Sequence, residues 1–298
     1  PYPADICSQI NFAQFMDQMD VQVSLNDQPF KINLATMKQL NATGGERDIR
    51  VVKAPQDLGL GGILDMSVLK TFHVPEDSPL KYWLEVDCRE FLWCFDHQGS
   101  TSLNCALFPV AQDSPEFQVV QQWFTQTCPK QVVAVVRIQN PTLLRRWNTV
   151  FQDIHDDQQQ VELQYVWHGT RAEKNLMRIA SGGFEKQYAD SAWSNNLYGK
   201  GAYFAQSADY SSSYSCYPPT GWNNPRLPKL QATDKLMFLA CLCVGRKTKG
   251  SRDIFPPEIP GSTVKFDTMV DNVEKPRIFV ATRDDQALPV YMVAFRQS

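Results

Sequence analysis

The longest uninterrupted run of apolar residues in this chain covers residues 236–244. A helix that crosses a membrane needs about 20 apolar residues, so this run is too short to span a bilayer. Its length is instead typical of a strand that is buried inside a sheet. Further apolar segments occur along the second half of the chain, and the sequence predicts strands over residues 132–138, 163–167, 201–205, 277–282 and 290–295.

Helical patterns are fewer than strand patterns. Two helices are expected to begin at a polar residue followed by proline, and a third at a Thr-x-x-Glu capping box that a later glycine closes. These signals are Ser114 with Pro115, Asn140 with Pro141, and Thr170 with Glu173, where Gly182 or Gly183 closes the third helix. Many strands and few helices, without regular alternation, predict an α+β fold.

The composition indicates a globular protein, with 298 residues of which 43% are hydrophobic and 20% are charged. The 29 basic and 32 acidic residues leave a net charge of −3, so nucleic acid is not expected as the main partner. No segment resembles a secretion signal or a membrane span. The eight cysteines form no C-x-x-C pair, and with only four histidines they predict no metal site. Scattered thiols indicate a reducing compartment, so we expect an intracellular location, in the cytoplasm, the nucleus or both.

The patterns divide the chain into three parts. Residues 1–56 predict a small α+β unit, residues 57–111 a connector, and residues 112–298 the main domain. The elements expected in the first part are a helix over 10–18 and strands over 21–25, 30–34 and 47–52.

Several common catalytic motifs are absent from the sequence. It has no G-x-x-x-x-G-K-[ST] phosphate loop, no G-x-G-x-x-G after a strand, no G-x-S-x-G and no H-E-x-x-H. Phosphate-loop nucleotide hydrolases, dinucleotide-fold dehydrogenases, serine hydrolases and zinc proteases are therefore poorly supported.

One set of residues with a common chemistry remains. His168 and Gly169 follow a predicted strand, and a glycine there lets a ligand approach the backbone N–H and C=O groups. A glycine-hinged turn leads into the strand that carries Tyr203, and Ser211 and Tyr214 follow three residues apart. Backbone amides, a hydroxyl and two aromatic rings suit a flat aromatic ligand that bears a carboxamide. Each residue taken singly also fits a structural role in a core or a surface turn.

Five segments in order carry a family resemblance. They are 137–141 (RIQNP), 168–170 (HGT), 198–205 (YGKGAYFA), 266–272 (FDTMVDN) and 289–295 (PVYMVAF). Together they resemble the catalytic domain of the poly(ADP-ribose) polymerase (PARP) family, over about residues 112–298. Within that family the chain is most similar to the mono-ADP-ribosyltransferases that contain a WWE domain. The resemblance implies an ADP-ribosyltransferase fold of two packed, mainly antiparallel sheets with flanking helices.

The resemblance also implies NAD as substrate, no metal, and a role for each matching residue. His168 matches the first member of the family's His-Tyr-Glu triad and would hold a ribose hydroxyl of NAD. Gly169 would pair its backbone with the nicotinamide carboxamide, and Ser211 would bond the same group through its hydroxyl. Tyr214 would stack on the nicotinamide ring, and Tyr203, the second triad member, would close its other side. The donor loop over the cofactor would be residues 185–197.

The third triad position falls on Met292, where polymer-forming members have glutamate. A carboxylate there can help to activate an acceptor sugar, whereas a thioether is a weak acceptor and no base. The departure predicts transfer of a single ADP-ribose to a protein side chain, of another protein or of this chain itself. The alternative is a catalytically weak relative that serves as an NAD-binding, ADP-ribose-binding or interaction module, in which Met292 packs in the core.

Residues 1–56 resemble the second half of a WWE domain, a module that can bind ADP-ribose in this family. The matching segments are 30–34 (FKINL), 37–41 (MKQLN) and 47–50 (RDIR). Phe30, Gln39 and Arg47 would face the ligand, and an arginine there suits a phosphate. The first half of such a domain does not precede them, so the segment is expected to be truncated or degenerate. A scaffold that only packs against the main domain is the other interpretation.

Overall fold

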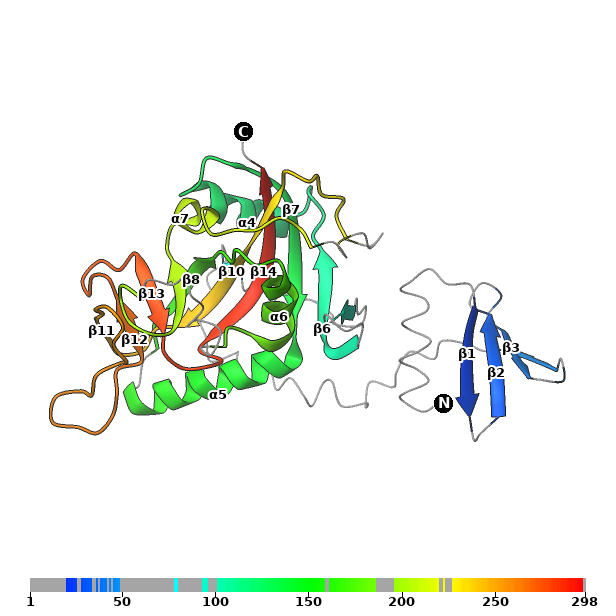
Figure 1. Cartoon of the computed structure of the whole chain (residues 1–298), viewed down its shortest axis with the longest axis horizontal. Helices are drawn as coiled ribbons and strands as arrows, with labels where there is room; N and C mark the ends of the chain where they lie inside the picture. The colour runs from blue at the N-terminus through cyan, green and yellow to red at the C-terminus, as the bar shows by residue number, and fades with distance from the viewer. Residues whose placement is uncertain are drawn as a thin grey trace. The chain divides into compact units, whose positions relative to one another are not determined.

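The computed structural model describes residues 20–25, 28–33, 36, 38–41, 43, 45–48, 78–79, 93–95, 101–158, 161–185, 196–219, 222 and 227–296. The chain forms two compact units (Figure 1). The first comprises Pro1–Phe72 with Thr101–Leu103, and the second comprises His73–Ser100 with Asn104–Ser298. No helix in the described ranges is long and apolar enough to cross a membrane.

The first unit contains a four-stranded antiparallel sheet whose strands pair in chain order. They are β1 (Asp20–Leu25), β2 (Gln28–Asn33), β3 (Lys38–Asn41) and β4 (Glu46–Asp48). The three predicted strands correspond to β1, β2 and β4, and β3 is an addition. The helix expected over 10–18 lies outside the described residues.

The second unit is built on a ten-stranded sheet with four described helices. The strands are β5 (Trp93–Phe95), β6 (Thr101–Pro109), β7 (Gln131–Gln139), β8 (Leu163–His168), β9 (Ala202–Ala205), β10 (Lys235–Cys243), β11 (Lys247–Lys249), β12 (Thr268–Val270), β13 (Ile278–Ala281) and β14 (Ala287–Arg296). The helices are α4 (Pro115–Thr125), α5 (Pro141–Gln158), α6 (Lys174–Gly182) and α7 (Ala208–Ser212).

The strand order in this sheet is β11-β12-β13-β9-β8-β10-β14-β7-β6-β5. Neighbours from β6 to β12 are antiparallel, and β11 pairs with β12 in parallel. The predicted α+β class and antiparallel character are confirmed. The two implied sheets are halves of one continuous sheet, because β8 and β9 meet through a single register pair, Trp167 with Ala205.

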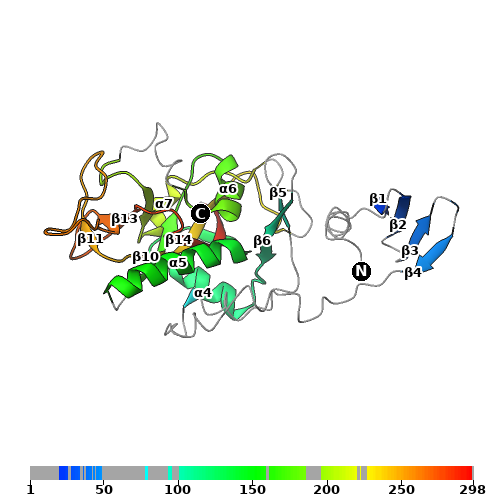
Figure 2. The same cartoon turned by 90° about the horizontal axis from the view of Figure 1, so that it is seen from below.

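Helices α4 and α6 cover opposite faces of the sheet (Figure 2). The Phe124 ring of α4 lies 5.5 Å from the Trp167 ring of β8. On the other face, Leu176 of α6 belongs to the same buried cluster as Phe238 and Met292. Helix α5 packs against β10 and β14, and its buried apolar residues are Leu143, Leu144, Trp147, Phe151 and Ile154.

The connector predicted over 57–111 is corrected by the structure. Strands β5 and β6 lie inside it and form one edge of the ten-stranded sheet. Cys105 and Leu107 of β6 are buried, and residues 106–109 of this strand are fixed by antiparallel pairing with β7. The second unit therefore begins well before residue 112.

The three predicted helix starts have different outcomes. Asn140 caps α5 as predicted, since its Oδ1 accepts the Leu143 N–H at 3.1 Å. Ser114 caps α4 as predicted, since its Oγ accepts the Phe117 N–H at 3.2 Å. The capping box at Thr170 is wrong, because α6 begins at Lys174 and Glu173 has a helical backbone without a side-chain cap. The Thr170 hydroxyl instead accepts from Asn175 Nδ2 at 3.1 Å.

Candidate active site

The candidate residues meet where β8 ends beside β9 and α7. His168 is the last residue of β8, and its Nδ1 lies 2.8 Å from the Tyr203 carbonyl oxygen on β9. A carbonyl can only accept, so Nδ1 carries a proton and Nε2 of a neutral ring remains an acceptor. Burial lowers the pKa of His168 from its ordinary 6.5, and the bond to Tyr203 opposes this in part. The imidazole is therefore neutral at pH 7.

Three phenylalanines surround the His168 ring. Its centroid lies 5.0 Å from Phe184, 5.4 Å from Phe204 and 6.4 Å from Phe238. Gly183 ends α6 at a φ of 88°, a conformation that favours glycine, and so directs Phe184 back toward the sheet. The sequence analysis missed these rings because they come from three separate segments.

Gly169 brings the end of β8 against the last turn of α7 and the residues that follow it. A Cβ at this position would lie 2.2 Å from the Ser211 carbonyl oxygen and 3.0 Å from Tyr214 Cβ, so no larger residue fits unchanged. Ser211 is buried, and its hydroxyl donates to the Trp167 carbonyl at 3.0 Å. The structure thus places Gly169, Ser211 and Tyr214 at one spot.

The two candidate tyrosines have different surroundings. The Tyr203 hydroxyl donates to the Gly199 carbonyl at 2.7 Å and accepts the Tyr198 N–H at 3.0 Å. Burial raises the pKa of Tyr203, so its hydroxyl keeps its proton at neutral pH. The Tyr214 ring is 37% exposed, and Arg171 Cζ lies 5.0 Å from its centroid. Tyr214 is therefore the candidate ring that solvent and ligand can reach.

The loop between α4 and β7 holds α7 in place. Lys130 Nζ donates to Asp209 Oδ1 at 2.8 Å and to Ser212 Oγ at 2.5 Å. Thr127 Oγ1 accepts the Ala208 N–H at 2.9 Å. These contacts come from residues that the sequence analysis did not single out.

Met292 lies away from these groups, within the hydrophobic core. It is 0% exposed, and it faces Phe238 on β10 and Val136 on β7. Phe238 in turn pairs with His168, so one cross-strand row runs from His168 through Phe238 to Met292. Met292 is thus a buried position separated from His168 by the single strand β10, and its part in the catalytic group stays a prediction.

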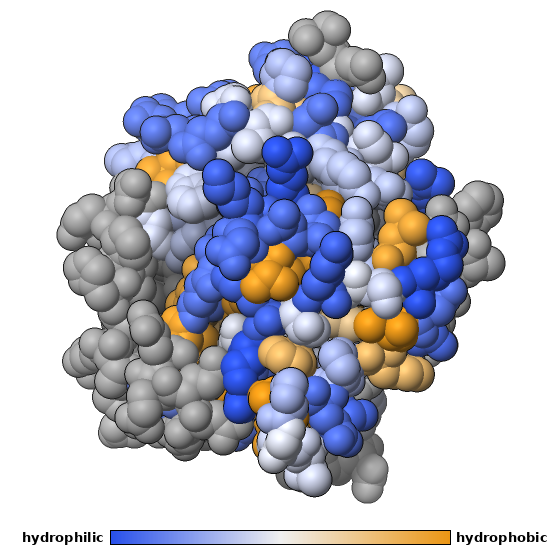
Figure 3. All heavy atoms as spheres, turned by 90° about the vertical axis from the view of Figure 1, so that its left-hand side faces the viewer, coloured by the Kyte–Doolittle hydropathy of each residue, from blue (hydrophilic) through white to orange (hydrophobic). Residues whose placement is uncertain are grey.

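A cavity of about 690 Å³ is lined by residues of the segments that flank β9, β12 and β13, and none of the candidate residues His168, Gly169, Tyr203, Ser211 and Tyr214 lines it. Its lining includes Glu185, next to Phe184, and Gly201, two residues before Tyr203. It also includes three cations and a ring that is 65% exposed: Lys200, Lys265, Arg283 and Phe255. The end of the unit that carries β11 to β13 is otherwise mostly hydrophilic, with small separate hydrophobic patches (Figure 3).

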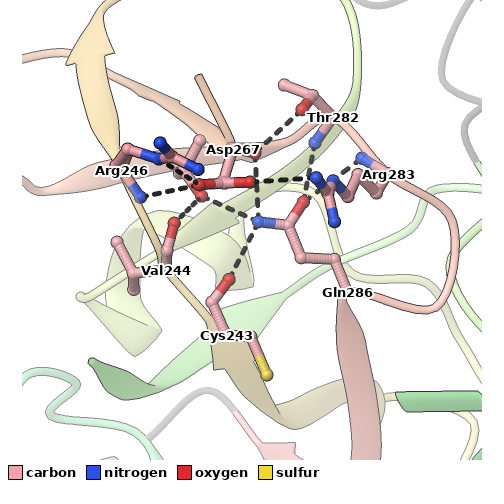
Figure 4. Close-up of polar contacts among 8 residues, drawn as sticks. Cys243, Val244, Arg246, Asp267, Thr282, Arg283 and Gln286 are labelled. Carbon is pink, nitrogen blue, oxygen red and sulfur yellow. Dashed lines mark hydrogen bonds and ion pairs between the residues drawn. The ribbon is translucent and has the colours of Figure 1, made fainter. Parts of the chain in front are cut away.

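One wall of this cavity is fixed by the buried carboxylate of Asp267 (Figure 4). Its oxygens lie 3.3 Å from Arg283 Nη2 and 2.9 Å from the Arg246 backbone nitrogen. Gln286 completes the network by donating to the Cys243 carbonyl at 2.8 Å and accepting the Thr282 N–H at 3.0 Å. The segment 266–272 therefore contributes structure here, and it does not reach His168.

The remaining candidates lie in the other unit or outside the described residues. Gln39 pairs with both Ile32 and Arg47, and Phe30 lies two residues before Ile32, so these side chains share one face of the four-stranded sheet. Ile32 and Gln39 are buried on that face. Of the donor loop, residues 186–195 lie outside the described residues. Within the described ranges, no group of three His, Cys, Asp or Glu residues could hold a metal.

Comparison with known proteins relates the chain to one family. A model of the poly(ADP-ribose) polymerase catalytic domain matches residues 114–297. Human protein mono-ADP-ribosyltransferase PARP14 is 31% identical over 203 residues, which cover 65% of this chain and 10% of that protein. Mouse protein mono-ADP-ribosyltransferase PARP10 is 29% identical over 190 residues, covering 61% and 18%. Human protein mono-ADP-ribosyltransferase PARP11 is 26% identical over 280 residues, which cover 89% of this chain and 75% of that protein.

The match includes the whole junction that His168, Gly169, Tyr203, Ser211 and Tyr214 form. The chain spans less than a fifth of the length of PARP14 and of PARP10. Because the family model covers more than half of the sequence, the chain belongs to the family of the poly(ADP-ribose) polymerase catalytic domain.

Proposed function

We propose that this chain transfers one ADP-ribose from NAD to a protein side chain and releases nicotinamide. The observation that carries the proposal is the close packing of Gly169 against Ser211 and Tyr214. It sets backbone polar groups, a hydroxyl and an exposed ring around one spot, as a nicotinamide with its carboxamide requires.

Each group has a defined part in holding NAD. The backbone of Gly169 pairs with the carboxamide, and the Ser211 hydroxyl, which donates to Trp167, accepts a carboxamide N–H. Tyr214 stacks on the nicotinamide ring, and Tyr203 closes the other side. Nε2 of the neutral His168 accepts a hydrogen bond from a ribose hydroxyl, because Nδ1–H is already bonded to the Tyr203 carbonyl.

Bond cleavage then depends on position and surroundings. The bond between ribose and nicotinamide breaks through a transition state with oxocarbenium character, as in glycoside chemistry. The residues named above hold the nicotinamide and the ribose in the orientation that bond cleavage requires. The phenylalanines around His168 exclude water. The row from His168 to Met292 supplies a thioether where a carboxylate would activate an acceptor sugar, which favours single transfer over polymer growth.

The proposal also covers the acceptor of the ADP-ribose, the role of the first unit and the location of the protein. The acceptor is a protein side chain that enters through the cavity beside Gly201, or a residue of this chain itself. The first unit recognises ADP-ribose through Phe30, Gln39 and Arg47, whose shared face supports this role. An intracellular location is part of the proposal, and the buried thiols of Cys128, Cys216, Cys241 and Cys243 support it.

Automodification of the full chain with labelled NAD tests the proposal. We expect single ADP-ribose additions by mass, lost in His168→Ala and kept in His155→Ala, a matched variant on α5. A ladder of polymer would contradict the argument from Met292. No label, with NAD still raising the melting temperature, would instead indicate a binding module without turnover. No label and no stabilisation by NAD would contradict the proposal altogether.

A further inference from the structure

A short segment that precedes the matched domain is anchored on the central sheet. Ser78 is 1% exposed, and Pro79 is also buried. The Ser78 hydroxyl forms a hydrogen bond with the Tyr165 hydroxyl of β8. The Pro79 carbonyl oxygen lies 2.9 Å from the Tyr291 hydroxyl of β14, across 212 residues of sequence. Two tyrosine hydroxyls thus hold adjacent residues of this segment.

A buried ion pair between Glu116 and Arg137 lies beside this anchor. The Tyr291 hydroxyl also lies 2.8 Å from Glu116 Oε1, so its one proton serves two acceptors. Glu116 is held by Arg137 through two bonds of 2.6 Å, from Nε and from Nη2. Burial raises the pKa of Tyr291 well above its ordinary value, so the hydroxyl keeps its proton.

The sequence at the anchor has a second property. Residues 78–81 read Ser-Pro-Leu-Lys, a serine followed by proline and, two residues later, by a basic residue. This is the substrate pattern of proline-directed protein kinases. The serine of that pattern is the same serine whose hydroxyl bonds to Tyr165.

We propose that Ser78 is a phosphorylation site, and that residues 78–79 form a clasp which is docked when unmodified and released when phosphorylated. In the modification, the Ser78 oxygen attacks the γ-phosphorus of ATP bound to a proline-directed kinase. The bond from that phosphorus to the oxygen bridging to the β-phosphate breaks, ADP leaves, and the serine proton passes to a base of the kinase.

The chemistry of the docking site explains the release. A phosphoserine carries about −1.5 to −2 charges at pH 7, and re-docking would take this charge out of water. The Glu116 carboxylate, which shares the Tyr291 hydroxyl with the Pro79 carbonyl, repels it, and Arg137 is already paired with Glu116 through Nε and Nη2. The Tyr165 hydroxyl is too weak a partner to offset this desolvation.

Access for the kinase comes from local opening. The segment is held by side-chain hydroxyls, so it can open without unfolding the sheet. Phosphorylation of the folded chain should then be slower than that of a free peptide with the same sequence. The difference measures how much of the time the clasp is docked.

The test uses the full chain, ATP and a purified proline-directed kinase, with a peptide of residues 73–85 run beside it. We expect phosphate at Ser78 by mass in both, with the chain at least tenfold slower. Hydrogen exchange at the backbone amides around residue 78 should then rise in the modified chain. Absence of phosphate at Ser78 of the folded chain overturns the site, and unchanged exchange after modification overturns the release.

Two variants test the clasp itself. Tyr165→Phe and Tyr291→Phe each remove one hydroxyl that holds the segment, so each should speed modification of Ser78 by about fivefold. Tyr217→Phe is the matched control, since Tyr217 is 54% exposed, and its rate should equal that of the unmodified sequence. Equal rates in all three variants would overturn the clasp, even if Ser78 is modified.

Discussion

Strands β8 and β14 present different chemistry on the two faces of the same sheet. One face carries His168 and Met292 in a row with phenylalanine and valine, and the buried cluster on that face is apolar. The other face carries Tyr165 and Tyr291, in contact with Ser78, Pro79 and an ion pair.

The comparison shows what each face can accept. The apolar face contains His168, whose buried ring is neutral and donates Nδ1–H to the Tyr203 carbonyl. The polar face buries a full ion pair because each carboxylate oxygen has a guanidinium donor. A charge is thus tolerated on one face and excluded from the other, and the following predictions test that difference.

The largest effect is expected from placing an ionisable group on the apolar face. Met292→Glu puts a carboxyl between Phe238 and Val136, where burial must raise its pKa and keep it protonated at pH 7. We expect a loss of about 4 kcal/mol in the free energy of unfolding, a drop in melting temperature of about 10 °C. Thermal unfolding measures both, and the loss should shrink at pH 5.5, where the unfolded state also binds more protons.

Met292→Leu is the control for that substitution, because it keeps volume and polarity and should change the free energy of unfolding by less than about 1.5 kcal/mol. Equal melting temperatures for the glutamate and leucine variants would show that the apolar row accepts a charge. Appearance of polymer in the glutamate variant would show that the row reaches the acceptor sugar.

Breaking the ion pair on the polar face should have the next largest effect. Glu116→Gln leaves the buried Arg137 guanidinium without its carboxylate, and we expect a loss of about 3 kcal/mol by denaturant unfolding. Glu162→Gln is matched in chemistry but breaks an exposed pair with Lys247, so its loss should stay below about 1 kcal/mol. Similar losses in the two variants would contradict the role of burial.

Gly169→Ala tests the junction at the end of β8. Its Cβ would meet the Ser211 carbonyl at 2.2 Å, so the segment after α7 must move away from the nicotinamide position. We expect transfer to fall by about 100-fold, together with a lower melting temperature, because the clashing atom belongs to the backbone. Gly182→Ala in α6 is the control, since its Cβ meets only the flexible end of Glu185 at 3.2 Å. Full activity in the Gly169 variant would argue against this spot as the carboxamide site.

The smallest effect concerns pH. Because burial lowers the pKa of His168 below 6.5, its Nε2 should stay an acceptor from pH 8 down through 6.5. NAD affinity, measured by calorimetry, should change by less than about twofold over that range and decline only at lower pH. A decline that begins above pH 7 would mean that the histidine is charged in the folded protein. The free energy of unfolding should likewise fall as the pH drops below about 6.5, because the unfolded chain then binds a proton at His168 that the folded chain does not.

Local features of the sequence determined much of this protein. The apolar run 236–244 forms β10 because a strand of that length can be buried on both faces. Ser114 caps α4 because a cap needs only its own backbone and the next turn. The segments around His168, Tyr203 and Ser211 were found from sequence, since their glycines and polar residues form motifs within a few positions.

Tertiary structure decided the rest, where partners far apart in sequence compete with local preference. The Thr170 hydroxyl bonds to the Asn175 side chain in the first turn of α6 and does not cap a backbone N–H, and β6 joins the sheet because it pairs with β7. Met292 lies in the core because its neighbours across β10 and β7 are apolar. The docking of Ser78 and Pro79 depends on hydroxyls from β8 and β14, which no local pattern can indicate. Sequence periodicity reports backbone preference over a few residues, whereas the pairing of distant strands decides which side chains meet.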